Sequence, residues 1–213
     1  MRLTIWIACA WFLGASLSRA ADNDFKPLFN GKDFTNWHLV GAAPGAPAPW
    51  VIKEGGVYAC QPGTRGWLSS DKEYENFHLK FEFKISPKGN NGVWIRCPET
   101  GHQSRLGYEF QIYDDGRPPH KGSTASVYDC IPPSKAAWKP AGEWNSAEVI
   151  ANKSRVTHIL NGEKVIDVDF DDPEVNAKLD DDHKLSKRQR KGHIGLSNHN
   201  NACEFRNFFI KEL

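Results

Sequence analysis

The stretch HLKFEFKI, residues 78–85, decides the fold class of this chain. Its apolar side chains, Leu79, Phe81, Phe83 and Ile85, alternate with polar ones. Successive side chains of a strand point to opposite faces, so this pattern places one face in a core and the other in solvent. The stretch therefore predicts a half-buried strand of an antiparallel sheet.

Similar short strand patterns, separated by turn residues, fill the rest of the chain. RVTHIL runs through Asn161-Gly162 into EKVIDVDF, and Asn-Gly suits the left-handed dihedrals of a type I′ hairpin turn. A second hairpin is indicated where Glu54-Gly55-Gly56 separates two apolar segments. Together with GVWIRC, SAEVIA, HIGLSNH and CEFRNFFIKEL, these segments predict an all-β, two-sheet antiparallel sandwich or jelly roll.

The first twenty residues have the features of a signal peptide. Arg2 precedes the apolar run LTIWIACAWFLGASLS, which ends at Ser18-Arg19-Ala20, a small-x-small site suited to signal peptidase. The run is shorter than the roughly 20 apolar residues that span a bilayer, and no second run follows. We therefore expect residues 1–20 to be removed, residues 25–213 to form a single periplasmic or extracellular domain, and no integral membrane segment to remain.

Charge and cysteine content exclude two further classes of protein. Lys and Arg number 27 against 26 Asp and Glu, so the chain has no excess positive charge to attract nucleic acid. Cys60, Cys97, Cys130 and Cys203 are widely spaced and lack the close pairs of a zinc site. Export permits disulfides, but Cys97 falls at an apolar strand position and the domain is large enough to fold without them, so we expect limited disulfide use.

The stretch GYEFQIYDD, residues 107–115, separates apolar from polar side chains. Tyr108, Phe110 and Ile112 fall on one face of the predicted strand, and Glu109 and Gln111 fall on the other. An ordinary half-solvated strand would show the same alternation. The same parity in neighbouring segments yields a candidate polar groove of Glu82, Trp94, Arg96, Glu109, Gln111, Glu204 and Arg206.

Trp94 and Arg96 suit a sugar, because an indole stacks on C–H faces and a guanidinium makes forked hydrogen bonds to oxygen atoms. For Glu204 and Arg206, a simple ion pair is an equally good interpretation.

Five segments in order resemble the 3-keto-disaccharide hydrolase family. They are PLFNGKDFTNWH, NFHLKFEFKISPKGNNGVWIR, GYEFQIYDD, KPAGEWNSAEVIANKSRVTHILNGEKV and KGHIGLSNHNNACEFRNFFIKEL, and the resemblance covers essentially all of residues 25–213. It implies a concanavalin A-like lectin/glucanase jelly roll with a carbohydrate site on its concave sheet. It also implies cleavage of glycosides already oxidised at C3.

The family pattern can be matched residue by residue. Its motifs correspond to Asn91-Gly92, Arg96, Gly107-Tyr108-Glu109, Gln111, Asp114, Tyr128, His199 and Glu204-Phe205-Arg206-Asn207. Two positions depart from the pattern: Ser197 stands where Gln is usual, and the segment ending at Tyr128 replaces a Thr-Gly-Ala-x-Tyr segment. These departures bear on substrate specificity more than on the fold.

The chemistry needs a base, a group that stabilises an enolate, and an acid. A C3 carbonyl acidifies the C2 proton, so removal of that proton gives an enolate, whose collapse expels the C1 substituent before water adds back. Glu109 or His199 is the candidate base, Arg96 or Arg206 the candidate stabiliser, and Asp114 or Glu204 the candidate acid or ligand of a divalent cation.

Trp94, Gln111 and Tyr128 complete the predicted set of substrate-binding residues, and the sequence identifies no other cofactor. The expected partner is a small carbohydrate, a 3-keto-glycoside. The competing hypothesis is a non-catalytic, lectin-like carbohydrate-binding module, because this fold class serves both.

Overall fold

A computed structural model describes residues 24–114 and 116–213 of the chain. The predicted signal peptide, residues 1–20, lies outside this range, so its removal stays a prediction. Within the described residues, none of the helices has the length and apolar character needed to cross a membrane.

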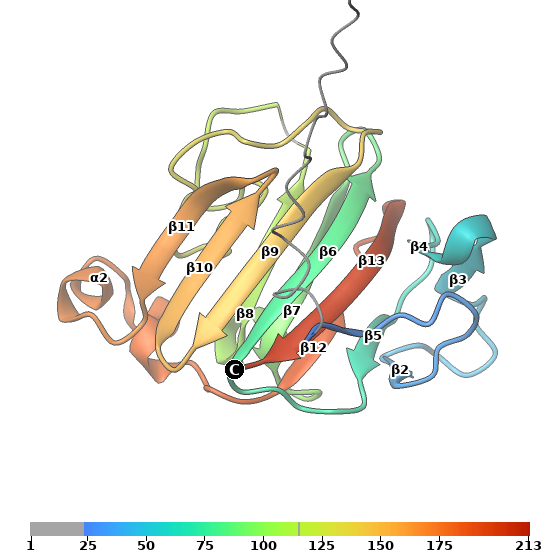
Figure 1. Cartoon of the computed structure of the whole chain (residues 1–213), viewed down its shortest axis with the longest axis horizontal. Coiled ribbons are helices and arrows are strands. Elements are labelled where there is room, and N and C mark those ends of the chain that lie inside the picture. The colour runs from blue at the N-terminus through green and yellow to red at the C-terminus, as the bar shows by residue number, and fades with distance from the viewer. Residues whose placement is uncertain (1–23, 115) are drawn as a thin grey trace, which may run out of the picture.

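Two antiparallel sheets pack face to face, which confirms the predicted sandwich (Figure 1). The larger one, sheet A, runs in the order β11–β10–β9–β6–β13–β4–β3, and β1 adds to β13. Its strands are β1 (Lys26–Pro27), β3 (Trp50–Lys53), β4 (Val57–Cys60), β6 (Phe77–Ile85), β9 (Asn145–Asn152), β10 (Arg155–Leu160), β11 (Glu163–Asp169) and β13 (Cys203–Glu212).

Sheet B lies behind sheet A in Figure 1 and runs in the order β2–β5–β12–β7–β8. Its strands are β2 (Trp37–Val40), β5 (Trp67–Ser70), β7 (Asn90–Cys97), β8 (Tyr108–Tyr113) and β12 (His193–Leu196). The helices are short and lie in connections: α1 (Gln103–Leu106), α2 (Pro173–Ala177), and single 3-10 turns at Glu54–Gly56, Asp181–His183 and Leu185–Lys187.

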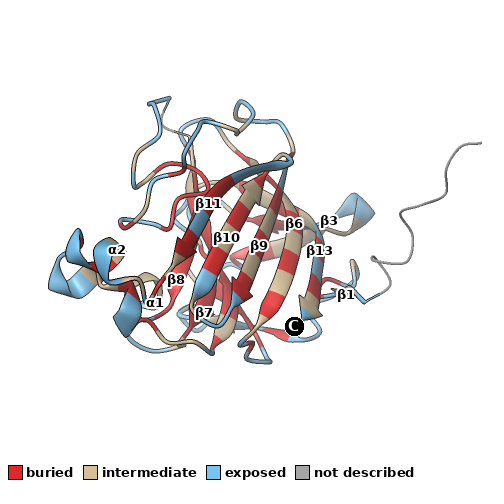
Figure 2. Ribbon diagram, turned by 60° about the vertical axis from the view of Figure 1, so that its left-hand side comes forward, coloured by how far each residue is buried: buried red, intermediate tan, exposed pale blue. Residues whose placement is uncertain are grey.

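The core lies between the inner faces of the two sheets. Figure 2 shows buried and half-buried residues alternating along β6, as its sequence predicts. The rings of Phe81 and Phe83 face Phe110 of β8, with centroids 5.4 and 6.3 Å away. Each fully buried phenylalanine contributes roughly 1.5–3 kcal/mol of hydrophobic stabilisation.

A β-bulge in β7 changes the predicted position of Arg96. Trp94 pairs with Gly195, yet Cys97 pairs with His193, so β7 holds one extra residue, and Arg96 has a φ of 51°. The Arg96 guanidinium donates to the carbonyl oxygens of two loop residues, Glu75 at 2.7 Å and Lys153 at 2.9 Å, and its side chain is buried. The prediction that Arg96 lines a substrate groove is therefore wrong, because the bulge interrupts the alternation on which it rested.

All four described cysteines are buried free thiols. Cys60 of β4 and Cys203 of β13 are direct cross-strand partners. Burial raises the pKa of Cys60, and that of Cys97, to about 12, which keeps both thiols protonated and unreactive at neutral pH.

We expect the purified exported protein to contain at most one disulfide, between Cys60 and Cys203, since strand pairing holds these two side by side. Mass spectrometry of unreduced peptides checks this. A bridge that involves Cys97 or Cys130 would contradict it.

Candidate active site

A row of side chains crosses the outer face of sheet B. Ser69 pairs with Gly195, Gly195 pairs with Trp94, and Trp94 pairs with Glu109. The N–H of Tyr128 donates to the carbonyl oxygen of Glu109 at 3.0 Å, which places Tyr128 beside β8. Residues opposite each other in antiparallel strands point to the same side, so Trp94, Glu109 and Tyr128 are neighbours on this face.

Two glycines leave the space that these side chains occupy. A Cβ on Gly195 would lie 2.8 Å from the Trp67 ring and 3.1 Å from the Trp94 ring, while one on Gly92 would lie 2.0 Å from Glu109 Oε1. The two indole rings meet edge to face, 4.9 Å apart. The aromatic rings and the carboxyl group therefore lie close against the sheet, and glycines within strands mark such close approaches.

Burial dominates the electrostatics of Glu109. Its side chain is 4% exposed, and burial raises its pKa to about 8. The indole N–H of Trp94 is close enough to oppose this rise but makes no well-formed hydrogen bond, so burial prevails. A carboxyl group with this pKa exchanges its proton near neutral pH, as general acids and bases do.

Among the buried polar atoms of this face, Glu109 Oε1, Trp94 Nε1 and Ser126 Oγ have no hydrogen-bond partner within the described residues. Ser126 lies beside β8, where its carbonyl oxygen accepts from the N–H of Gln111 at 3.3 Å. A buried polar group without a partner costs about 1–3 kcal/mol, so such groups in native proteins meet water or a ligand. A polar ligand seated beside Glu109 would satisfy them.

Tyr128 links the row to a small hollow. Its side chain is 37% exposed, and partial burial, together with the nearby Asp129 and Glu109 carboxylates, raises its pKa. Its hydroxyl group therefore stays protonated at neutral pH and can donate. The hollow beside it, about 110 Å³, is lined by His102, Ser104, Arg105, Tyr128, Asp129, His183 and Arg188.

His158, which sequence reasoning missed, contacts the segment that leads to Tyr128 from inside the sandwich. Its Nδ1 lies 2.9 Å from the carbonyl oxygen of Ala125, a residue with a φ of 68°. Burial lowers the pKa of His158 to about 4, so the neutral ring donates this hydrogen bond and holds Ser126–Tyr128 against β8. The sequence did indicate that His158 is buried, because it has the same strand parity as the apolar Val156 and Leu160.

The other end of the row carries a second polar cluster that sequence reasoning also missed. Glu99 accepts a hydrogen bond from Ser69 Oγ at 2.8 Å and lies 2.6 Å from His38 Nε2. His38 Nδ1 meets Asp71 at 2.7 Å, and His193 Nε2 lies 3.8 Å from Glu99. Burial by itself would lower the pKa of His38. The hydrogen bonds to Asp71 and Glu99 outweigh burial, so this pKa is raised.

The predicted catalytic residues His199 and Asp114 lie beyond the row. Asp114 ends the β8 hairpin, where its carboxylate accepts from the N–H of Lys88 at 2.8 Å. His199 is exposed in the loop after β12, although surrounding protein atoms displace enough water from its ring to lower its pKa. Among the described residues, no hydrogen bond joins either one to Glu109.

Two predicted substrate-binding residues, Glu204 and Arg206, belong to sheet A. Glu204 forms ion pairs with Lys53 at 2.6 Å and Lys84 at 2.8 Å, and Arg206 pairs with Glu82 at 2.6 Å. The single predicted groove is therefore wrong, because strand parity tells which face of a sheet a residue occupies but not which sheet. Trp94, Glu109, Gln111 and Tyr128 are the predicted site residues that the structure brings together.

A divalent cation finds no ready set of ligands in the described part of the chain. No group of three or more His, Cys, Asp and Glu side chains there is arranged to hold one. Of the two predicted ligands, Asp114 caps a backbone N–H and Glu204 is held between two lysines. Neither carboxylate points to a shared cation site.

Comparisons with known proteins place this chain in a family. A family model described as the 3-keto-alpha-glucoside-1,2-lyase-like domain matches residues 24–211. A Bacteroides thetaiotaomicron protein named 3-keto-disaccharide hydrolase is 27% identical over an alignment of 238 positions, which spans 93% of this chain and 82% of that protein.

Solved structures agree on the fold. A Parabacteroides distasonis protein classed provisionally as a glycosyl hydrolase superposes with a TM-score of 0.71 and 26% identity, over 90% of this chain and 94% of that one. An endo-β-1,3(4)-glucanase of family GH16 has a TM-score of 0.57 and 12% identity, over 89% and 92% of the two chains, and it resembles this chain in fold alone. The predicted lectin/glucanase sandwich is confirmed.

We expect Glu109→Gln to remove a pH dependence of stability. Because the folded-state pKa of about 8 lies above the ordinary value of 4.5, stability is highest below pH 4.5, where the carboxyl is protonated in both states, and it falls as the pH rises from 4.5 through 8. Between pH 5 and pH 9 the wild type should lose on the order of 2–4 kcal/mol of unfolding free energy relative to the variant. Denaturant unfolding across this range measures it.

Glu204→Gln is the matched control. Burial by itself would raise the pKa of Glu204, but its ion pairs with two lysines outweigh burial and lower this pKa. Its pH profile between pH 5 and pH 9 should run parallel to that of the wild type. Parallel profiles for Glu109→Gln as well would contradict a buried carboxyl that titrates near pH 8.

Proposed function

This chain belongs to the family of 3-keto-alpha-glucoside-1,2-lyase-like domains, and on that premise we propose that it is an exported enzyme that cleaves glycosides already oxidised at C3. The family and its hydrolase-named relative support a carbohydrate-cleaving function in general. The observation that carries the specific proposal is Glu109, a buried carboxyl with a pKa of about 8 beside unpaired polar atoms and the indole of Trp94. Export, to the periplasm or the medium, rests on the signal-like residues 1–20.

The reaction begins with proton transfer from C2 to the Glu109 carboxylate. The C–H electron pair forms the enolate of the C3 ketone. When the ketone re-forms, C1=C2 becomes a double bond, the C1–O bond breaks, and the leaving oxygen takes a proton. Water then adds across C1=C2, with hydroxide at C1 and a proton at C2, so the net reaction is hydrolysis.

The other roles fall to groups that lie on the same face as Glu109. The unpaired N–H of Trp94 is a donor for the enolate oxygen, a role that Arg96 and Arg206 cannot take from where they lie. The Tyr128 hydroxyl, protonated at neutral pH, is the donor for the leaving oxygen. His199 is the reserve candidate for the base, since a lowered pKa keeps its ring neutral.

The length of the row suits a disaccharide. Neighbouring strands lie about 4.8 Å apart, so three strand spacings separate Ser69 from Glu109 by roughly 14 Å. Trp94 is partly exposed midway, where an indole can stack against a sugar ring. The cluster around Glu99 would then meet the hydroxyl groups of the second sugar.

We expect Glu109→Gln to reduce kcat/KM for a 3-keto-disaccharide by about 10²–10⁴, because loss of a general base typically costs this much. Turnover of the 3-keto-disaccharide and of its unoxidised parent measures it, with Glu204→Gln as the control expected to keep full activity. A folded Glu109→Gln enzyme with near-normal turnover would transfer the base to His199. Activity retained in His199→Ala as well would eliminate both candidate bases, whereas a wild type that binds the sugar without cleaving it would favour the carbohydrate-binding module.

The dependence of kcat/KM on pH shows whether Glu109 acts as a base or as an acid. If Glu109 removes the C2 proton, only its ionised form is active, so kcat/KM should rise with pH through about 8 and then level off. Initial rates across pH 6–10 test this. A rate that falls through pH 8 would instead make Glu109 the proton donor to the leaving oxygen.

A further inference from the structure

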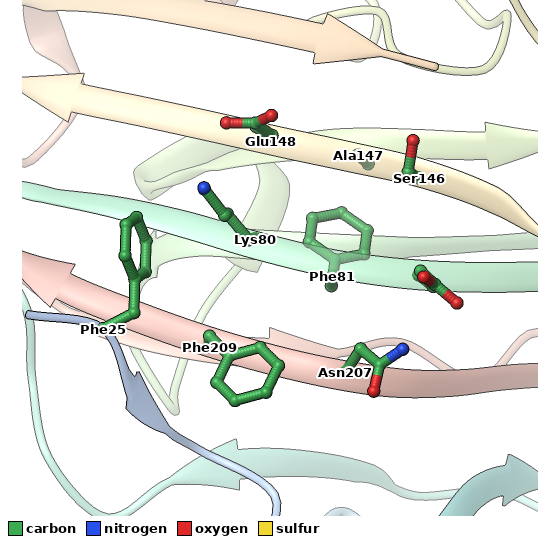
Figure 3. A pocket seen from close by; sticks show the side chains of 9 residues that line it. Phe25, Lys80, Phe81, Ser146, Ala147, Glu148, Asn207 and Phe209 are labelled. Atoms are coloured by element: carbon green, nitrogen blue, oxygen red, sulfur yellow. The ribbon is translucent and has the colours of Figure 1, made fainter. Parts of the chain in front are cut away.

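A second hollow, about 450 Å³ in volume, lies on the outer face of sheet A, across the sandwich from Glu109. Figure 3 shows side chains of β6, β9 and β13, with Phe25 beside β1, arranged around it. Its size falls within the range of small-molecule sites. It is lined by Phe25, Lys80, Phe81, Glu82, Ser146, Ala147, Glu148, Asn207 and Phe209.

A bulge in β13 shapes this hollow. Arg206 pairs with Glu82 and Phe209 pairs with Lys80, so β13 contains one residue more than β6 over this stretch. Asn207 has a φ of 51° at that point. A bulge bends its strand and re-aims side chains, and here both Asn207 and Phe209 border the hollow (Figure 3).

The charges around the hollow are already balanced. Glu82 is paired with Arg206 at 2.6 Å, and Glu148 is bonded to His78 Nε2 at 2.6 Å. Lys80 Nζ lies 4.4 Å from the ring of Phe25, so a cationic ligand on that ring would meet a second positive charge. An anionic ligand would meet the two carboxylates, so the lining favours an uncharged molecule.

The remaining chemistry fits a sugar. Glu82, Glu148 and the Asn207 amide offer oxygen acceptors for hydroxyl groups, and Ser146 and Asn207 can also donate. The ring of Phe209 is 36% exposed at the rim and offers an apolar surface for C–H groups. We infer that the hollow is a second carbohydrate site, which binds unoxidised pyranosides without cleaving them.

This site requires neither a ketone nor the chemistry of Glu109. It would hold unoxidised glycosides on sheet A, while the face of sheet B carries out the proposed cleavage.

Titration of the isotope-labelled Glu109→Gln protein with maltose, and separately with cellobiose, tests the inference by NMR. We expect backbone amide shifts in residues 204–210 and 146–148, with saturable binding of at least one of the two sugars. Phe209→Ser should weaken this binding about tenfold, as loss of a stacking ring at a small site does. Asn207→Gly should also weaken it, while glycine tolerates the positive φ.

Asn36→Gly is the matched control, because Asn36 is an exposed asparagine with a φ of 70° that lies outside the hollow. It should leave the affinity unchanged. Shifts confined to residues 92–111, or equal affinity in Phe209→Ser, would overturn the inference. Self-association that Phe209→Ser abolishes would also overturn it, by making the hollow a contact between copies of the chain. Failure of the wild type to cleave any 3-keto-glycoside would count against the proposed function alone and leave this titration intact.

Discussion

The packing of Phe110 against Phe81 and Phe83 is the contact on which the rest of the structure depends. These rings join the middle of sheet A to the edge strand of sheet B across one core. Because side chains alternate along a strand, burying Phe110 on the inside obliges Glu109 to face outward. The hydrophobic effect is non-directional, yet by burying Phe110 it fixes the face on which the Glu109 carboxyl group lies.

Glu109 carries an electrostatic cost that the core offsets. Its carboxyl group is desolvated, its Oε1 has no hydrogen-bond partner among the described residues, and a Cβ on Gly92 would collide with it. Functional sites commonly hold such unfavourable groups at the expense of stability. A near-neutral pKa is the chemical result, and it follows from burial rather than from a neighbouring charge.

Two bulges shape the two outer faces of the sandwich. In β7 the extra residue turns Arg96 away from the outer face of sheet B, and its guanidinium joins two loops. In β13 the extra residue opens the hollow bordered by Asn207 and Phe209. The arginines that sequence parity assigned to one groove thus serve as structural ties, and the donors left beside Glu109 are the indole of Trp94 and the hydroxyl of Tyr128.

Local periodicity alone determined that this chain forms an antiparallel sandwich, that Phe81 and Phe110 are buried, and that Glu109 and Gln111 share the opposite face, because these depend only on the alternation along one strand. The tertiary structure decided which residues from different strands are neighbours. Glu204 and Glu109 have equivalent parity but belong to different sheets, since pairing between distant strands is settled by the packing of the whole core. The same applies to His158, whose contact with Ala125 joins sheet A to the loop beside β8, and to Arg96, whose bulge arises only when β7 pairs with β12.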